Sequence, residues 1–306
     1  LVPIATGGDG GGSIRMPAAL CGVVGLKPTY GRISEHGAAP LCWSVAHVGP
    51  LGASIYDTAL AYAAMAGPDS ADPNTFWQPP LKLDDSTPSP ASPIRLGVFE
   101  PWFEDAQDSI VEACRHLLDT LATVGVELVP IELPDLGLLR TAHMVTISTE
   151  MLSSQRKWLE KHRSDYGCDT RLNLALAERI SADDYIRAQR MRGRFFRHFM
   201  TALEGVDAIV TPTTGCTATP INPKAESYGE SNLTLLDQIM RFAPAANLTG
   251  LPALSIPIGF DGRGLPIGIQ LMGAPWSEAK LLGIGSLIEQ QAEHRISAVH
   301  QSLIES

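Results

Sequence analysis

Residues 7–15 read GGDGGGSIR, so five of nine positions are glycine and one hydroxyl, that of Ser13, lies between the glycine run and Arg15. Glycine adopts positive φ readily and lets other groups approach the backbone closely. Consecutive amides in such a loop can point the same way and form an anion-binding nest. The stretch therefore predicts that Ser13 attacks a carbonyl group whose oxyanion is held by the amides of Gly10, Gly11, Gly12 and Ser13.

Three other glycine-rich motifs do not fit these residues. A phosphate-binding loop needs a Lys-Ser or Lys-Thr pair after its last glycine, whereas Ser13-Ile14-Arg15 follows here. The dinucleotide fingerprint fails because Ser13 stands where its last glycine should be. The nucleophile elbow fails because Arg15 replaces its second glycine. From this chemistry alone, a nucleophilic serine and a structural glycine turn both stay open.

The residues that follow favour the nucleophile. Residues 10–19 read GGGSIRMPAA and residues 21–32 read CGVVGLKPTYGR. Together they resemble the second half of the amidase signature, and similarity to that family continues almost to the end of the chain. The resemblance implies that Ser13 is the acyl-enzyme nucleophile and that the amides of the preceding glycines form the oxyanion hole. It also implies that Asp9 and Arg15 mainly support the loop.

The amidase signature implies an α/β fold, with a large mixed central β-sheet covered by helices on both faces. The residue pattern agrees with this class. Residues 94–99 and 126–131 each predict a strand, and between them Ile110 to Leu121 carries apolar residues at helical spacing. Such a β-α-β unit indicates a sheet covered by helices.

The whole chain is predicted to form the C-terminal two-thirds of a single amidase domain, residues 1–306. Residues 1–67 contain the signature segment with the nucleophile, residues 68–93 a proline-rich surface connection, and residues 94–306 the remainder of the α/β core. The strand before the glycine loop has no visible beginning, so we expect the fold here to lack its N-terminal part.

Two serines are predicted to begin helices. Ser54 and Asp57 form a variant capping box before a helix that ends near Ala66, and Ser181 caps a long helix. The second helix carries an arginine cluster, which we interpret as a solvated or salt-bridged face rather than a lipid-binding patch because acidic residues flank it. The cluster consists of Arg187, Arg190, Arg192, Arg194 and Arg197.

Composition restricts the classes of partner and cofactor. The 306 residues have a net charge of −10 and few lysines, which argues against a nucleic-acid-binding surface. Five scattered cysteines form no C-x-x-C pair and the histidines show no metal-ligand spacing, so neither a metal nor another cofactor is predicted. An intracellular, reducing setting fits best. Peripheral association with an internal or plasma membrane and a homodimer both stay open.

Further motifs narrow the resemblance, namely DGGGS at 9–13, MPAALC at 16–21, AYAA at 61–64, AH at 142–143 with TI at 146–147, YIRAQR at 185–190 and GAPWS at 273–277. Within the family, these motifs most resemble those of plant-type fatty acid amide hydrolases. The resemblance implies hydrolysis of a small-molecule acyl amide, an N-acylethanolamine, to a fatty acid and ethanolamine. Two alternatives stay open. One is a glutamyl-tRNA amidotransferase A-type or other small-amide amidase, and the other is a catalytically inactive amidase-like binding subunit.

The family mechanism uses a Ser-Ser-Lys triad, in which a neutral lysine acts through a bridging serine. Family members carry both residues upstream of the glycine loop, but residues 1–12 contain neither lysine nor serine. We expect Lys27 to be structural and His47 to line or support the site rather than act as base. Two explanations compete, a fragment of a longer amidase and a degenerate homologue, and we prefer the fragment. We predict that the chain has little amidase activity on its own.

Overall fold

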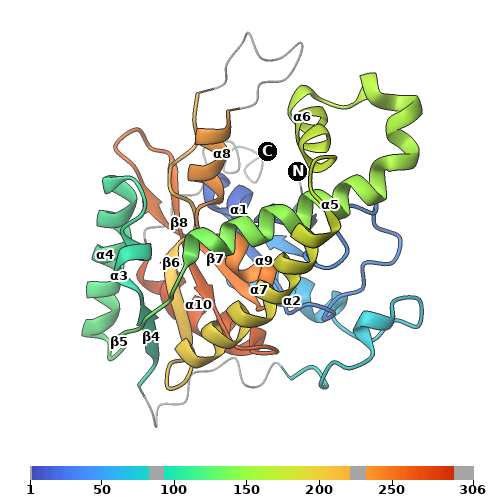
Figure 1. Cartoon of the computed structure of the whole chain (residues 1–306). Coiled ribbons are helices and arrows are strands. Elements are labelled where there is room, and N and C mark those ends of the chain that lie inside the picture. The colour runs from blue at the N-terminus through green and yellow to red at the C-terminus, as the bar shows by residue number, and fades with distance from the viewer. Residues whose placement is uncertain (1, 83–92, 221–231, 293–306) are drawn as a thin grey trace, which may run out of the picture.

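The computed structural model describes residues 2–82, 93–220 and 232–292, and a mixed β-sheet of eight strands runs through them (Figure 1). The strand order is β1-β3-β2-β7-β8-β6-β4-β5. Neighbours are antiparallel from β1 as far as β6, whereas β4 pairs in parallel with β6 and β5. The predicted mixed sheet is confirmed. The strands are β1 (Ile4–Gly8), β2 (Val24–Lys27), β3 (Val48–Gly52), β4 (Arg95–Val98), β5 (Glu127–Pro130), β6 (Ala208–Pro212), β7 (Ala253–Phe260) and β8 (Pro266–Met272).

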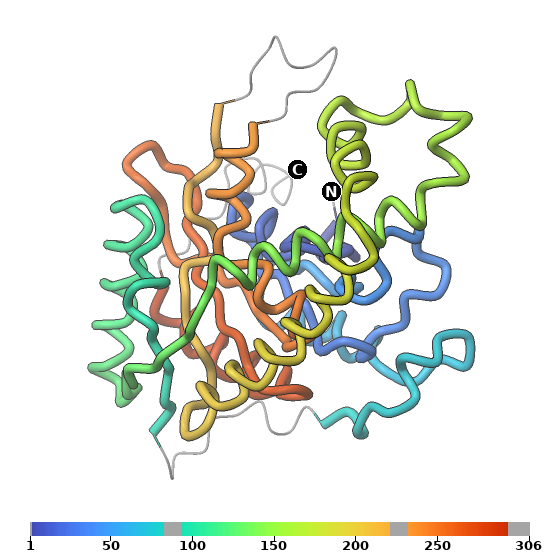
Figure 2. Tube along the Cα trace, in the orientation of Figure 1, coloured from blue at the N-terminus to red at the C-terminus, as the bar shows by residue number. Residues whose placement is uncertain are grey.

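Helices cover both faces of the sheet, as predicted. One face packs against α2 (Ile55–Met65), α4 (Asp108–Thr123) and α10 (Glu278–Gln291). The other face packs against α1 (Arg15–Cys21) and α9 (Pro244–Thr249), and the long helices α5 (Leu136–His162) and α7 (Ala182–Ala202) pack over α9. Figure 2 shows α5 and α7 crossing in front of the sheet. The shorter helices are α3 (Glu100–Phe103), α6 (Cys168–Ala177), α8 (Leu233–Met240), η1 (Pro73–Thr75) and η3 (Arg163–Asp165).

The central strands β2, β7 and β8 present two chemically different faces, because successive side chains of a strand point to opposite sides. The face toward α2, α4 and α10 is apolar, whereas the face toward α1 and α9 is polar or lacks a side chain over its middle, with the apolar Ala253 and Met272 at its edge. The apolar positions include Leu26, Leu254, Ile256, Ile269 and Leu271. The alternate positions are Gly25, Lys27, Ser255, Gly268 and Gln270.

Helix α1 lies directly on this second face. A Cβ atom at Gly25 would lie 2.8 Å from the Cβ of Ala18, and one at Gly268 would lie 2.7 Å from the Cβ of Ala19. Side chains at either glycine would lift the helix off the sheet. The seating of α1 fixes the loop that precedes it.

Several predicted elements are confirmed. The predicted strand–helix–strand unit corresponds to β4, α4 and β5. Ser54 accepts the amide of Asp57 at the start of α2, and Ser181 and Asp184 form a full capping box at the start of α7. Part of the predicted proline-rich connection, residues 83–92, lies outside the described residues. Among the helices of the described ranges, none combines the length and the apolar character that a membrane crossing requires.

Candidate active site

The glycine loop connects β1 to α1 on the polar side of the sheet. Gly12 has φ of +120°, and a Cβ atom there would lie 2.6 Å from the Cβ of Ala243, so both the backbone and the packing require glycine. Ser13 follows with an exposed side chain, whereas the loop residues before it are buried. Its hydroxyl has no hydrogen-bond partner within the described part of the chain.

Asp9 holds the loop from the inside. Its carboxylate accepts the amide of Gly12 at 2.7 Å, the amide of Ile14 at 3.1 Å and the side-chain amide of Asn247 at 2.8 Å. Its backbone amide and carbonyl both pair with the backbone of His47, which extends the β1–β3 ladder by one residue. The loop therefore bends around a single fixed carboxylate.

Arg15 connects this carboxylate to the rest of the fold. Its Nε and Nη2 donate to the two oxygens of Asp9, each at 3.0 Å. Nη1 donates to Gln270 of β8 at 2.6 Å, and Nη2 also donates to Asn247 of α9 at 2.6 Å. These contacts are the kind that the predicted supporting role of Asp9 and Arg15 requires.

The electrostatics of this ion pair favour its charged form. Burial would raise the pKa of Asp9, but the Arg15 guanidinium and the hydrogen bonds from Arg15 and Asn247 outweigh it and hold the pKa below its usual range. Both side chains are fully buried. A buried ion pair whose oxygens are all hydrogen-bonded fixes geometry, because loss of either partner leaves an uncompensated charge.

Three amides of the loop, those of Gly10, Gly11 and Ser13, have no hydrogen-bond partner within the described residues. In each case the carbonyl group of the same peptide unit accepts a hydrogen bond from elsewhere in the protein. The carbonyl of Asp9 accepts from His47 and Asn247, that of Gly10 accepts from His143, and that of Gly12 accepts from the Met16 amide. A trans peptide directs its N–H opposite to its C=O. Because the three carbonyl groups are held, the three free N–H groups point to the opposite side of the loop. The Gly12 amide differs, because it already donates to Asp9.

His47 and Lys27 lie buried beside this network, and burial lowers the pKa of both. Burial first and the nearby Lys27 second hold the pKa of His47 well below its usual range. Burial and then the charge of Arg15 lower the pKa of Lys27 in the same way. Lys27 Nζ donates to the Pro28 carbonyl at 2.9 Å, and His47 Nδ1 lies 2.8 Å from the Val45 carbonyl. No contact joins either residue to Ser13 within the described ranges, so neither is placed as its base.

The sequence singled out no role for Asn247, Gln270 or His143, which contact the loop from α9, β8 and α5. Asn247 lies in a block that resembles the amidase family, residues 246–257, and His143 in a pair that resembles plant-type enzymes. Those resemblances marked the positions without indicating what the side chains do. Gln270 was marked only as part of a strand.

A second network fixes the segment that packs over the loop, residues 40–47. Buried Glu150 of α5 accepts the amide and hydroxyl of Ser44 and the hydroxyl of Tyr185, and Arg192 of α7 donates to Ser44. The predicted solvated or salt-bridged arginine face of α7 is therefore wrong for Arg192, which is half-buried and donates to Ser44. Arg187 does pair with Asp183 at an exposed position.

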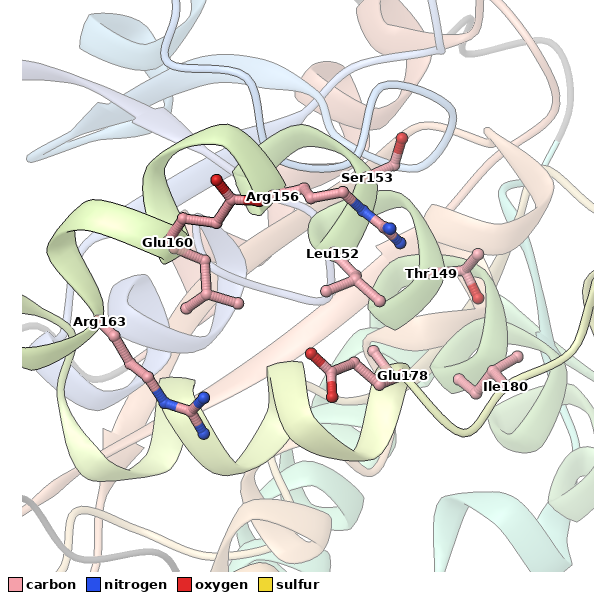
Figure 3. Close-up of a pocket in the computed structure, with 10 residues that line it drawn as sticks. Thr149, Leu152, Ser153, Arg156, Glu160, Arg163, Glu178 and Ile180 are labelled. Atoms are coloured by element: carbon pink, nitrogen blue, oxygen red, sulfur yellow. The ribbon is translucent and has the colours of Figure 1, made fainter.

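A separate pocket lies between α5 and α6, away from the glycine loop. Figure 3 shows Leu152 of α5 and Glu178, the residue that follows α6, facing each other across it. Arg156, Glu160 and Arg163 also line it, and all of these charged side chains are exposed. Charges of both signs at exposed positions favour no particular class of ligand. Elsewhere in the described ranges, no cluster of His, Cys, Asp or Glu is arranged to hold a metal ion.

Comparison with known proteins gives consistent matches. The chain is 42% identical over 298 residues to the fatty acid amide hydrolase of Medicago truncatula, covering 95% of this chain and 49% of that protein. It is 31% identical over 317 residues to the A-type subunit of the glutamyl-tRNA(Gln) amidotransferase of Thermus thermophilus, covering 96% of this chain and 65% of that protein. The chain thus spans about half the length of the plant relative.

A solved structure and a family profile extend this result to the fold. The A-type subunit of the glutamyl-tRNA(Gln) amidotransferase of Thermotoga maritima superposes with a TM-score of 0.79 at 30% identity, covering 96% of this chain and 64% of that one. Residues 1–282 match the profile of the Amidase family. With that profile covering most of the chain and the glycine loop at its expected place, this protein belongs to the amidase signature family.

Proposed function

We propose that this chain carries the acyl-transfer half of an amide hydrolase site, with Ser13 as nucleophile. The observation that carries the proposal is the set of three free amides, Gly10, Gly11 and Ser13, whose peptide carbonyls are all held on the opposite side. Such fixed donors stabilise charge that develops on a carbonyl oxygen during attack. The exposed Ser13 hydroxyl lies at the end of the same loop.

The proposed donor set differs from the sequence expectation at one residue. The Gly12 amide donates to Asp9 at 2.7 Å, so Gly12 contributes its positive φ and its lack of a side chain rather than a donor. Gly10, Gly11 and Ser13 then form the oxyanion hole. Asp9 and Arg15 keep the loop in this shape.

In the proposed reaction, Ser13 Oγ forms a bond to the amide carbon and its proton passes to a base. The oxyanion then collapses, the C–N bond breaks, and the leaving amine takes a proton. Water hydrolyses the resulting serine ester to a carboxylic acid and frees Ser13. We assign the base to the lysine and bridging serine that the amidase signature implies. Neither residue type occurs among residues 1–12.

The proposed substrate class is a fatty acyl amide such as an N-acylethanolamine. The support is the 42% identity to a protein named fatty acid amide hydrolase. The 31% identity to an A-type amidotransferase protein keeps a small-amide substrate as the second candidate. Release of ethanolamine from an N-acylethanolamine, compared with release of ammonia from glutamine, distinguishes the two.

Covalent labelling tests the nucleophile directly. We expect a fluorophosphonate to attach to the wild-type chain at Ser13, identified by peptide mass spectrometry, and not to attach in Ser13→Ala. Ser164→Ala changes an exposed serine in η3 and should label as the wild type does. A wild-type chain that labels no more than Ser13→Ala would show that this chain does not activate Ser13 by itself and would favour the inactive binding subunit.

A further inference from the structure

We propose that His143 is a positioning residue that aims the Gly11 amide into the oxyanion hole. This inference rests on the proposed function, because it assigns the amide a role in acyl transfer. His143 lies on α5 and is 2% exposed, and its Nε2 is 2.8 Å from the carbonyl oxygen of Gly10. The two residues are 133 positions apart in the chain.

The direction of this hydrogen bond follows from chemistry. A carbonyl oxygen only accepts, so His143 Nε2 must carry the proton and donate it. Burial first, partly offset by the Gly10 hydrogen bond, lowers the pKa of His143 to about 4. At neutral pH the ring is therefore uncharged, and its single N–H is the one directed at Gly10.

The hydrogen bond from His143 to the Gly10 carbonyl fixes the direction of the Gly11 N–H, which His143 itself does not contact. The Gly10 carbonyl and the Gly11 N–H belong to one planar trans peptide and point in opposite directions. When His143 holds the carbonyl, the Gly11 N–H must point to the other side of the loop. It has no hydrogen-bond partner there within the described residues.

No other hydrogen bond in the described part of the chain fixes this peptide. The Asp9–Gly10 peptide is held twice, by His47 and Asn247, whereas His143 gives the Gly10 carbonyl its one hydrogen bond. Glycines on both sides place no side-chain barrier on rotation of the peptide once that bond is lost. The imidazole also packs closely, since a Cβ atom at Gly11 would lie 3.2 Å from His143 Cε1.

Two substitutions separate positioning from packing. His143→Gln keeps an N–H donor near the position of Nε2, whereas His143→Leu keeps the bulk and removes the donor. If His143 only fills space, the apolar leucine should serve better than the polar glutamine in this buried position. If it positions the peptide, the order is reversed. His162→Gln, at the exposed end of the same helix, is the matched control.

The first readout is the rate constant of fluorophosphonate labelling at Ser13. Loss of one oxyanion donor reduces reaction rates by about 100- to 1000-fold. A misdirected donor keeps part of its effect, so we expect the labelling rate constant to fall by about 10- to 100-fold. We expect this loss in His143→Leu, a change within about threefold in His143→Gln and none in His162→Gln. Equal labelling of the leucine and glutamine variants would overturn the inference.

The second readout does not require activity. Crystal structures of the variants should show the Gly10–Gly11 peptide rotated in His143→Leu and unrotated in His143→Gln. An unrotated peptide in His143→Leu overturns the positioning role at any labelling rate. If the wild type itself does not label, the proposed function has failed, and the peptide orientation alone then decides whether His143 positions the Gly11 amide.

Discussion

Asp9 and Arg15 form an ion pair beneath the glycine loop, with Arg15 Nη2 3.0 Å from Asp9 Oδ1 and neither side chain exposed. The guanidinium also donates to Gln270, Asn247 and the Ala243 carbonyl. Its planar fork therefore joins the loop to β8 and α9 at once. Lysine, with a single point charge, could not reproduce this set of contacts.

We expect Arg15→Leu to lower the free energy of unfolding by about 3–5 kcal/mol, because it leaves the Asp9 charge buried without a partner. Urea denaturation of the wild type and the variant measures the difference. Arg187→Leu is the control, since its pair with Asp183 is exposed and should be worth less than about 1 kcal/mol. Equal losses of unfolding free energy in the two variants would show that the buried pair contributes no more to stability than the exposed one.

The contribution of Asp9 to stability should depend on pH. Its folded pKa lies below the ordinary value of 3.8, so its contribution is present in full above that value and is lost as pH falls toward the folded pKa. The stability difference between wild type and Asp9→Asn should therefore shrink as pH is lowered from about 6 to about 3. Urea unfolding at several pH values measures it. A difference that grows on acidification would contradict the depressed pKa.

Gly12→Ala should both destabilise the fold and abolish labelling at Ser13. Alanine at positive φ costs about 1–2 kcal/mol, and the new Cβ would lie 2.6 Å from that of Ala243. Gly37→Ala separates the two causes, because Gly37 has φ of +85° with open space around the position of a Cβ. We expect Gly37→Ala to lose stability only by the backbone cost and to label normally. Normal labelling of Gly12→Ala would show that the loop tolerates another shape.

Lys27→Met tests the structural interpretation of the buried lysine. The folded pKa of Lys27 lies well below 10.5, so the unfolded chain binds the extra proton and wild-type stability rises with pH up to that value. Methionine removes this dependence. We expect Lys27→Met to be at least as stable as the wild type at neutral pH, with the gap narrowing toward alkaline pH, and to label normally. Loss of labelling would instead place Lys27 in proton transfer.

Hydrolysis by the 306-residue chain should be slow even where labelling at Ser13 succeeds. The reason is that turnover needs a base and an acid for two proton transfers, whereas the Ser13 hydroxyl has no hydrogen-bond partner within the described residues that could serve as either. Release of ethanolamine from an N-acylethanolamine measures turnover. Rapid release that disappears in Ser13→Ala would mean that other residues handle the proton.

Local sequence signals predicted the parts of the fold that local interactions decide. The capping serines Ser54 and Ser181 placed the starts of α2 and α7, and the apolar spacing after Ile110 placed α4. The glycine loop was recognisable because positive φ at Gly12 and close packing demand one residue type. These signals lie within a few residues of the structure that they specify.

The remaining part of the site depends on distant partners that no local pattern reveals. Arg15 was visible as a supporting residue, but its acceptors Gln270 and Asn247 are more than 200 residues away. Arg192 had the same local pattern as the other arginines of α7, yet Ser44 of a distant segment draws it inward. A resemblance marked the position of His143, but its contact with Gly10, 133 residues earlier, follows only from the fold.

The distance between Arg15 and its partners also has a consequence for biosynthesis. The acceptor on Gln270 is 255 residues downstream, and at about 5–20 residues per second a ribosome needs roughly 13–50 s to reach it. The nascent loop is therefore exposed long before β8 and α9 exist to shape it. During that interval Ser13 should behave as an ordinary hydroxyl, and its reactivity should arise only as the last strands join the sheet.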